Sequence, residues 1–151
     1  MRKMWTFIFL SIIISLVMIA PKGKDINFSL GKVEFYLSSY YNPNLSFATV
    51  TKNGNGCIIE SDAIYHNEIE ESILNYEGKT FITDGDEELF EELIQKFDLK
   101  VDETISSETN VYGYSDCFDK SINLSGKKIN TQMLFKDGKI FIGSPILLGS
   151  Y

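Results

Sequence analysis

The stretch INLSGKKINTQMLFKDGKIFIG, residues 122–143, decides the fold. It holds two tight turn signals, Ser125-Gly126 and Asp137-Gly138, each flanked by residues that alternate in polarity. This pattern is typical of β-hairpins with two-residue loops, and a loop of that length fixes which residues lie opposite each other. The predicted pairs are Leu124 with Lys127, Ile122 with Ile129, Phe135 with Ile140, and Met133 with Ile142.

Because side chains alternate between the two sides of a strand, this register predicts one apolar face and one polar face. The apolar face is expected to carry Ile122, Ile129, Thr131, Met133, Phe135, Ile140 and Ile142. The polar face is expected to carry Asn123, Lys128, Asn130 and Gln132. An antiparallel sheet of this kind needs a cover on its apolar face only.

Residues 86–97 are the predicted cover, an amphipathic helix that Asp84 or Asp86 can cap. Its apolar stripe consists of Leu89, Phe90, Leu93, Ile94 and Phe97. Leu93 is expected at the centre of the stripe, packed on the sheet face of Met133 and Ile142. The acidic residues of this segment fall outside the stripe and are expected to face solvent.

The remaining chain reads mainly as short strands. Alternation and turn residues predict strands over 33–39, 45–52, 57–60, 99–105 and 110–114, with a turn over 53–56, and residues 78–82 lead into the helix. Residues 61–76 are ambiguous, because Tyr65, Ile69, Ile73 and Tyr76 recur at helical spacing while the β-branched content also fits a strand or loop; we expect this stretch to be partly helical. The pattern indicates one α+β domain over residues 26–151.

The first twenty residues carry an export signal. Arg2 and Lys3 precede an uncharged, mainly apolar run over residues 5–20, which is the pattern of a signal peptide. As a hydrophobic helix, sixteen residues rise about 24 Å, slightly less than a hydrocarbon core of about 30 Å. A cleaved signal and an uncleaved membrane anchor both fit. Residues 21–25 form a short linker, and the domain after it is expected outside the cytoplasm, secreted or anchored to the cell membrane.

Charge argues against nucleic acid as a partner. From Pro21 onward the 14 basic residues lose Arg2 and Lys3, so 12 face all 21 acidic residues and the net charge is −9. Phosphate binding requires clustered cations. With 44% hydrophobic and 23% charged residues, the chain also has ordinary globular usage, which excludes a mainly disordered or polytopic membrane protein. Contact with a membrane is expected only through the N-terminal segment.

Cys57 and Cys117 are the only cysteines. An exported domain with an even cysteine count permits one disulfide, which would close a loop of about sixty residues and contribute about 4 kcal/mol in the chain-entropy model. The abundance of Ile, Lys and Asn suggests an AT-rich bacterial genome, and some such bacteria live without oxygen, so reduced thiols remain the alternative.

Few residues point to catalysis. His66, the one histidine, lies in a polar stretch and is expected on the surface. The sequence contains no nucleophile elbow, phosphate loop, dinucleotide fingerprint or zinc-helix motif, and we expect no cofactor and no metal site. Asn130 and Gln132, on the predicted polar face, are candidate ligand-binding residues. The alternative for both is cross-strand amide contacts or exposure to water.

Four motifs stand out in the C-terminal half: Tyr112-Gly113-Tyr114-Ser115, Lys128-Ile129-Asn130-Thr131-Gln132-Met133, Ile142-Gly143-Ser144-Pro145-Ile146 and the helix ending in Phe97-Asp98-Leu99-Lys100. In order and spacing they resemble the YwmB family of Gram-positive bacteria, and the resemblance covers residues 78–151. The chain departs from the family at Asp116, where a proline is common. Its N-terminal half is also shorter than in typical members and lacks the clear helix expected there.

This resemblance implies a TATA-binding-protein-like α+β fold, a curved antiparallel sheet with helices on one face. It implies an exported protein and no catalytic residues, so the expected function is a non-enzymatic binding or accessory module of the cell envelope, with an envelope protein or ligand as partner. The alternative is a cell-wall-directed hydrolase that uses a pair of carboxylates. DNA binding, which the fold name suggests, is rejected on charge and export.

Overall fold

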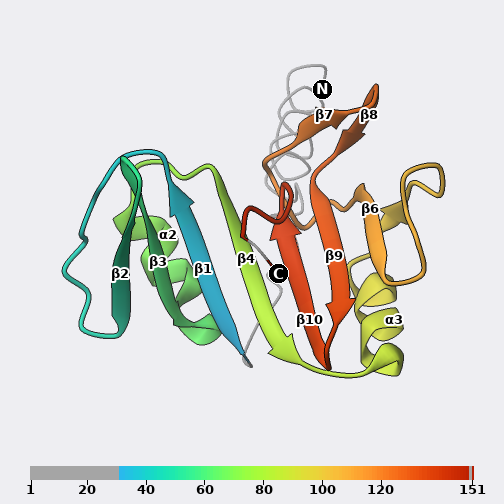
Figure 1. Ribbon diagram of the computed structural model, residues 1–151, viewed down its shortest axis with the longest axis horizontal. Coiled ribbons are helices and arrows are strands. Elements are labelled where there is room, and N and C mark those ends of the chain that lie inside the picture. The colour runs from blue at the N-terminus through green and yellow to red at the C-terminus, as the bar shows by residue number, and fades with distance from the viewer. Residues whose placement is uncertain (1–30, 150) are drawn as a thin grey trace, which may run out of the picture.

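The second predicted hairpin lies inside a large antiparallel sheet in the computed structural model, which describes residues 31–149 and 151 (Figure 1). Within these residues the sheet has eight strands, in the order β2-β3-β1-β4-β10-β9-β6-β5. The bounds are β1 Lys32–Leu37, β2 Ala48–Asn53, β3 Gly56–Asp62, β4 Gly78–Asp84, β5 Lys100–Val101, β6 Asn110–Tyr114, β9 Thr131–Lys136 and β10 Lys139–Ser144. A separate two-stranded sheet pairs β7 (Ile122–Leu124) with β8 (Lys127–Ile129).

The predicted register of both hairpins is confirmed. Phe135 lies opposite Ile140 and Met133 opposite Ile142, while Ile122 lies opposite Ile129. The prediction that all these residues share one sheet face is wrong for Ile122 and Ile129, because β7 and β8 form their own sheet. The chain leaves strand geometry at Asn130, so the alternation of side chains does not continue from β8 into β9.

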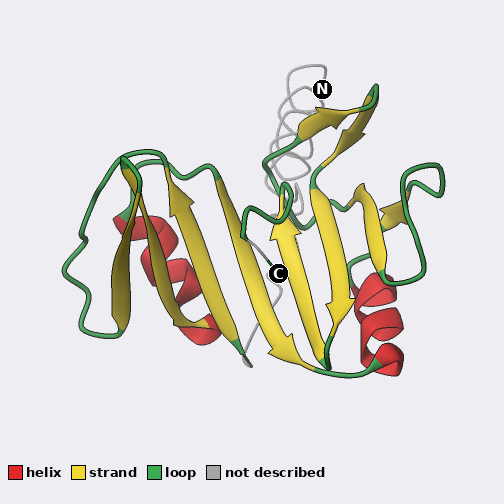
Figure 2. Ribbon diagram, in the orientation of Figure 1, coloured by secondary structure: helices red, strands yellow, loops and turns green. Residues whose placement is uncertain are grey.

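Two short helices complete the α+β fold: α2 (His66–Ser72), preceded by the 3-10 turn η1 (Ala63–Tyr65), and α3 (Glu87–Lys96). The expectation of a partly helical 61–76 is therefore confirmed. The predicted helix over 86–97 is confirmed too, and Asp86 caps it by accepting a hydrogen bond from the Leu89 backbone N–H at 2.9 Å. In Figure 2 the two helices flank the sheet near its opposite ends.

Both helices pack on the same face of the sheet and share one core. From α2, Ile69 and Ile73 join Val33 and Phe35 of β1 in this core. From the other half, the core takes in side chains of α3, its C-terminal end, β9 and β10: Phe90, Phe97, Met133, Ile140 and Ile142. We call the side that the helices cover the helix face, and the opposite side the open face.

The helix α3 is anchored by its phenylalanines. Phe90 is 2% exposed and Phe97 fully buried, whereas Leu93 is only half-buried at the rim of the core. The prediction that Leu93 is the central residue is therefore wrong. The larger aromatic rings reach deeper into the space between helix and sheet, where Phe90 packs on Phe135 at 6.1 Å between ring centroids.

The strand predicted over 99–105 is shorter than expected, and the helix predicted over 5–20 is not described. The strand expected over 99–105 shortens to two residues, because the Asp102 carboxylate accepts the Thr104 backbone N–H at 3.0 Å and turns the chain. The hydrophobic helix, signal or anchor expected over residues 5–20 lies outside the described residues.

In the part of the chain that the structure describes, no helix is both long enough and apolar enough to cross a membrane.

Removal of the Phe90 ring tests its role as an anchor of α3. Phe90→Ala is expected to lower the free energy of unfolding by about 3–5 kcal/mol, the usual cost of removing a buried phenylalanine ring. Leu93→Ala should cost clearly less, because that side chain is half-buried, and Glu92→Ala, exposed on the same helix, should stay within about 0.5 kcal/mol. Urea titration of the three variants measures this. Equal losses for Phe90→Ala and Leu93→Ala would contradict the assignment.

Candidate functional site

The Asn130 side chain, predicted to lie on an exposed polar face, is fully buried. Its Oδ1 accepts the Ser115 backbone N–H at 2.8 Å, and its Nδ2 donates to the carbonyl oxygens of Ser115 at 2.6 Å and Phe118 at 2.7 Å. One amide therefore satisfies three backbone groups of the loop after β6. This is the structural alternative raised for Asn130, and it corrects the expectation that the residue faces outward.

Gln132 does lie on the open face but is 9% exposed. Its Nε2 donates to Asn110 Oδ1 at 2.9 Å and to the Tyr112 hydroxyl at 3.1 Å, and its Oε1 accepts the Leu147 backbone N–H at 3.1 Å. The side chain thus links β6 to the C-terminal segment 145–151. The polar groups of both predicted site residues are occupied within the fold, so neither is retained as a binding residue.

The two cysteines are free thiols and lie in different halves of the sheet. Cys57, on β3, lies near the carbonyl oxygens of Ser39 and Tyr41. Cys117 follows β6 and lies near the carbonyl oxygen of Phe97. Four strands separate β3 from β6, so the two are about 24 Å apart at the usual strand spacing. A disulfide needs Cα atoms within about 7 Å, and the considered bridge is therefore not formed.

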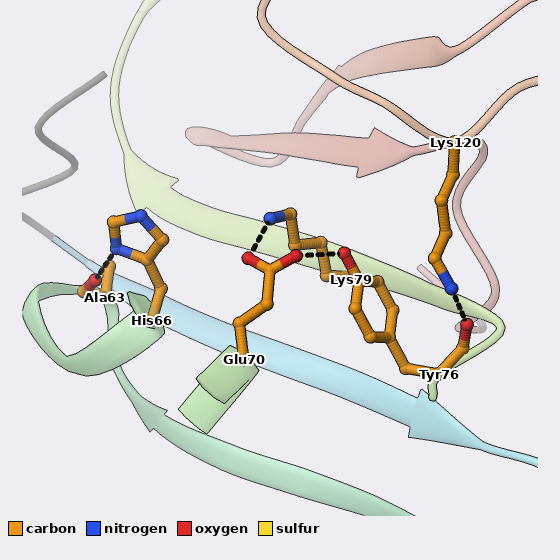
Figure 3. Close-up of polar contacts among 6 residues, drawn as sticks. All are labelled: Ala63, His66, Glu70, Tyr76, Lys79 and Lys120. Carbon is orange, nitrogen blue, oxygen red and sulfur yellow. Dashed lines mark hydrogen bonds and ion pairs between the residues drawn. The ribbon is translucent and has the colours of Figure 1, made fainter. Parts of the chain in front are cut away.

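A polar cluster that the sequence did not reveal lies between α2 and β4 (Figure 3). Glu70 of α2 is its centre: Oε2 pairs with the Lys79 ammonium of β4 at 2.6 Å, and Oε1 accepts the Tyr76 hydroxyl. One turn earlier on α2, His66 Nδ1 donates to the Ala63 carbonyl oxygen at 2.9 Å. His66 is half-buried against the Phe81 ring, at 5.5 Å between centroids, rather than exposed as predicted.

Aromatic rings surround the Lys79 charge. The ammonium lies 5.8–5.9 Å from the ring centroids of Phe35, Tyr76 and Phe81, and its side chain is 13% exposed. The detectable signal in the sequence was Lys79 itself, a charged residue two positions before Phe81 and therefore on the same, apolar face of β4. A charge in that position requires a buried partner.

Lys120 joins this cluster to the other half of the domain. It belongs to the loop after β6, and its ammonium donates to Asn75 Oδ1 at 3.2 Å and to the Tyr76 carbonyl oxygen. It also lies 3.7 Å from the centroid of the Tyr76 ring. Burial lowers the pKa of the Lys120 ammonium, and the nearby carboxylates of Glu77 and Glu70 offset part of this effect.

The electrostatics of Glu70 favour its charged form. Burial by itself would raise the pKa of this carboxyl, but the hydrogen bonds from Lys79 and Tyr76 and the Lys79 charge outweigh burial and hold the pKa below its ordinary value of 4.5. For Tyr76, burial and the bond to Glu70 raise the pKa of the hydroxyl well above its ordinary range. The cluster is therefore an ion pair with both carboxylate oxygens occupied, an arrangement that stabilises the fold.

A second polar cluster lies on the open face, where Glu34 and Tyr36 of β1 meet Tyr151. Glu34 Oε2 accepts the hydroxyls of Tyr36 and of Tyr151, the latter at 2.8 Å. Burial and the Glu34 hydrogen bond raise the pKa of Tyr36 well above its ordinary range, and burial raises the pKa of Tyr151 to about 12. The Tyr151 ring also packs on Phe141 at 4.5 Å between centroids, so these contacts hold the end of segment 145–151 on the open face.

The open face also carries a row of apolar side chains across the middle of the sheet. Ile82 of β4 lies opposite Phe141 of β10, which in turn lies opposite Leu134 of β9. Phe141 is covered by Tyr151, while Ile82 and Leu134 are half-exposed. Half-exposed Tyr112 and Tyr114 of β6 continue this face towards the sheet edge. These side chains form a surface that neither of the two described helices covers.

Among the described residues, no group of three or more His, Cys, Asp or Glu side chains is arranged to hold a metal ion. Comparison with known proteins gives no relative: no family model matches the chain, and no curated protein or solved structure shows significant similarity to it.

Removal of the buried amide tests its structural role. Asn130→Ala should lower the free energy of unfolding by about 3 kcal/mol, because it leaves buried backbone groups of Ser115 and Phe118 without partners, at about 1–3 kcal/mol each. The matched control is Asn123→Ala, exposed on β7, which should stay within about 0.5 kcal/mol. Thermal and urea unfolding measure both. Similar stability of the two variants would mean that the Asn130 amide is not buried.

The Glu70 ion pair should appear as a pH-dependent contribution to stability. Glu70→Ala is expected to cost about 1–3 kcal/mol at neutral pH, because Lys79 loses its charge partner in a mostly buried position. The pKa of Glu70 is depressed in the folded protein, so this contribution is complete above pH 4.5 and is lost as pH falls through the folded pKa. The difference from wild type should therefore shrink in acid. Glu71→Ala, at the exposed neighbouring position, should show no such trend.

Proposed function

We propose that the chain is a non-enzymatic, extracytoplasmic domain that binds a partner in the bacterial cell envelope. The export signal over residues 1–20 supports its location, and the net charge of −9 from Pro21 onward argues for a partner other than nucleic acid. The resemblance of residues 78–151 to the YwmB family supports an accessory role, and the one-sided cover of the sheet is compatible with a TATA-binding-protein-like arrangement.

The observation that carries this proposal is the open face. Both helices lie on one side of the sheet, and the other side presents the row of Ile82, Phe141 and Leu134 together with two tyrosines. Half-exposed aliphatic side chains beside tyrosines are the composition of protein-binding surfaces. One pair of charges on this face, Lys32 with Glu60 at 2.8 Å, is satisfied locally.

The alternative function is a wall-directed hydrolase. Its motivating feature is that Glu34 and Glu60 lie directly opposite each other on β1 and β3, on the open face. Two carboxylates on neighbouring strands are the minimum requirement for acid–base hydrolysis of a glycosidic bond. Against it, Glu34 accepts hydrogen bonds from two tyrosines and Glu60 pairs with Lys32, so each carboxylate already has a structural partner.

Site-specific crosslinking in intact envelopes tests the binding surface. A photo-crosslinking residue in place of Leu134 in the full chain should give a discrete adduct with one partner protein. The same residue in place of Ile64, exposed on η1 away from the open face, should give none.

Co-purification is a second test of the same surface. Leu134→Ser should reduce the yield of co-purified partner at least tenfold and leave the melting temperature within a few degrees, whereas Ile64→Ser should leave the yield unchanged.

Equal crosslinking from both positions, or full capture by Leu134→Ser, would overturn the open face as the binding surface. The hydrolase alternative predicts instead that purified full-length chain releases reducing sugar from cell-wall glycan, and that Glu34→Gln or Glu60→Gln abolishes the release. Release that is independent of both carboxylates would overturn that alternative.

A further inference from the structure

The two edges of the sheet differ in length. At one edge, β5 is two residues long, and at the other β2 is six residues long (Figure 1). Native sheets usually blunt their edges with short strands, charges or prolines, because unpaired main-chain groups recruit another strand. β5 follows this rule by its length. β2 does not: its sequence is ATVTKN, with three β-branched residues and a single charge.

The register shows which main-chain groups of β2 point outward. The two-residue turn Gly54-Asn55 places Asn53 opposite Gly56, and the residues flanking such a turn bond to each other. Hydrogen-bonded positions alternate along an antiparallel pair. Asn53, Thr51 and Thr49 therefore bond towards β3, and the N–H and C=O groups of Ala48, Val50 and Lys52 point away from the sheet.

The connection between β1 and β2 is drawn beside β2 in Figure 1, but its main-chain hydrogen bonds reach only the ends of this edge. Tyr40 N–H donates to the Asn55 carbonyl oxygen beside the turn, and Ala48 N–H donates to the Leu45 carbonyl oxygen at the start of β2. Within the described residues, the outward groups of Val50 and Lys52 make no hydrogen bond. The outward main-chain groups at the middle and end of the edge are therefore left for an incoming strand to pair.

We propose that the occupant of this edge is β2 of a second copy of the chain, paired antiparallel about a two-fold axis at Val50. In this register Val50 lies opposite its own copy, Thr49 opposite Thr51, and Ala48 opposite Lys52. No like charges meet, and facing threonines are a favourable cross-strand pair. The pairing forms two hydrogen bonds between the Val50 residues and one from each Lys52 N–H to the Ala48 carbonyl oxygen of the other copy.

A second copy is favoured over other occupants because both copies present the same β2 edge. When two identical strands pair antiparallel, the outward N–H groups of each face the outward C=O groups of the other, so the contact closes as a symmetric dimer. Head-to-tail pairing of β2 with β5 of another copy would build an open chain of molecules, but β5 offers only two residues. An unrelated extended peptide would need no such self-complementarity, and the experiment separates it by mass.

Cysteine crosslinking of the full chain tests the axis. Val50→Cys should form an intermolecular disulfide on mild oxidation, because facing residues in a hydrogen-bonded pair have Cα atoms about 5.5 Å apart. The control is Thr49→Cys, whose copies are diagonal neighbours at about 7–8 Å, beyond disulfide reach. The expected product is a band at twice the chain mass that disappears on reduction. Wild type, with its two native thiols, gives the background.

Several results would overturn the proposal. Equal dimer bands from both cysteine positions indicate random collision, no band from Val50→Cys excludes the axis, and an adduct of another mass identifies a different occupant.

A second measurement needs no cysteine: sedimentation of the purified full chain should show a concentration-dependent doubling of mass. Val50→Pro, which removes only an outward N–H, should abolish the doubling with the melting temperature nearly unchanged, and Thr51→Ala should preserve it. A monomer at every concentration contradicts the dimer.

Discussion

The pairing of β4 with β10 is the constraint on which the rest of the structure depends. β4 ends the N-terminal half of the sheet and β10 ends the C-terminal half, and six residue pairs join them, with Phe81 opposite Ile142 at the centre. This one contact merges two four-stranded units into a single sheet and places both helices on the same face. It also brings Ile82 and Phe141 together on the other face. The apolar row of the open face exists because these two strands meet.

Local features of the sequence predicted local structure well. Two-residue turns determined the register of both C-terminal hairpins, since a short loop leaves the flanking residues only one way to pair. The N-cap at Asp86 and the apolar stripe of α3 were predictable for the same reason, because each depends on residues that are close in sequence. The β4–β10 pairing joins residues about sixty positions apart, and no periodicity carries that information. The choice of Phe90 over Leu93 as the anchor was also unpredictable, because both lie on the stripe and only the depth of the packed sheet distinguishes them.

The candidate site residues were misjudged for a physical reason. Asn130 and Gln132 were assigned to a polar, exposed face by strict alternation, but Asn130 stands between two strands and turns its amide inward to the loop after β6. A buried amide with three backbone partners looks, in sequence, the same as an exposed one. Conversely, the sequence could show that Lys79 places a charge on an apolar strand face. It could not show that Glu70 is the partner of Lys79, because Glu70 lies on a helix whose position depends on the folded chain.

The open face and the β2 edge are geometrically linked. Antiparallel pairing of two identical edge strands places the two-fold axis perpendicular to the sheet, so the open faces of both copies lie on the same side. A dimer through β2 would therefore join two open faces into one continuous face, with the helices of both copies on the far side. Two linked surfaces raise the effective concentration of the second contact once the first has formed. The long β2 edge would then strengthen the binding proposed for the open face, because a partner that meets both copies is held more tightly than a partner that meets one.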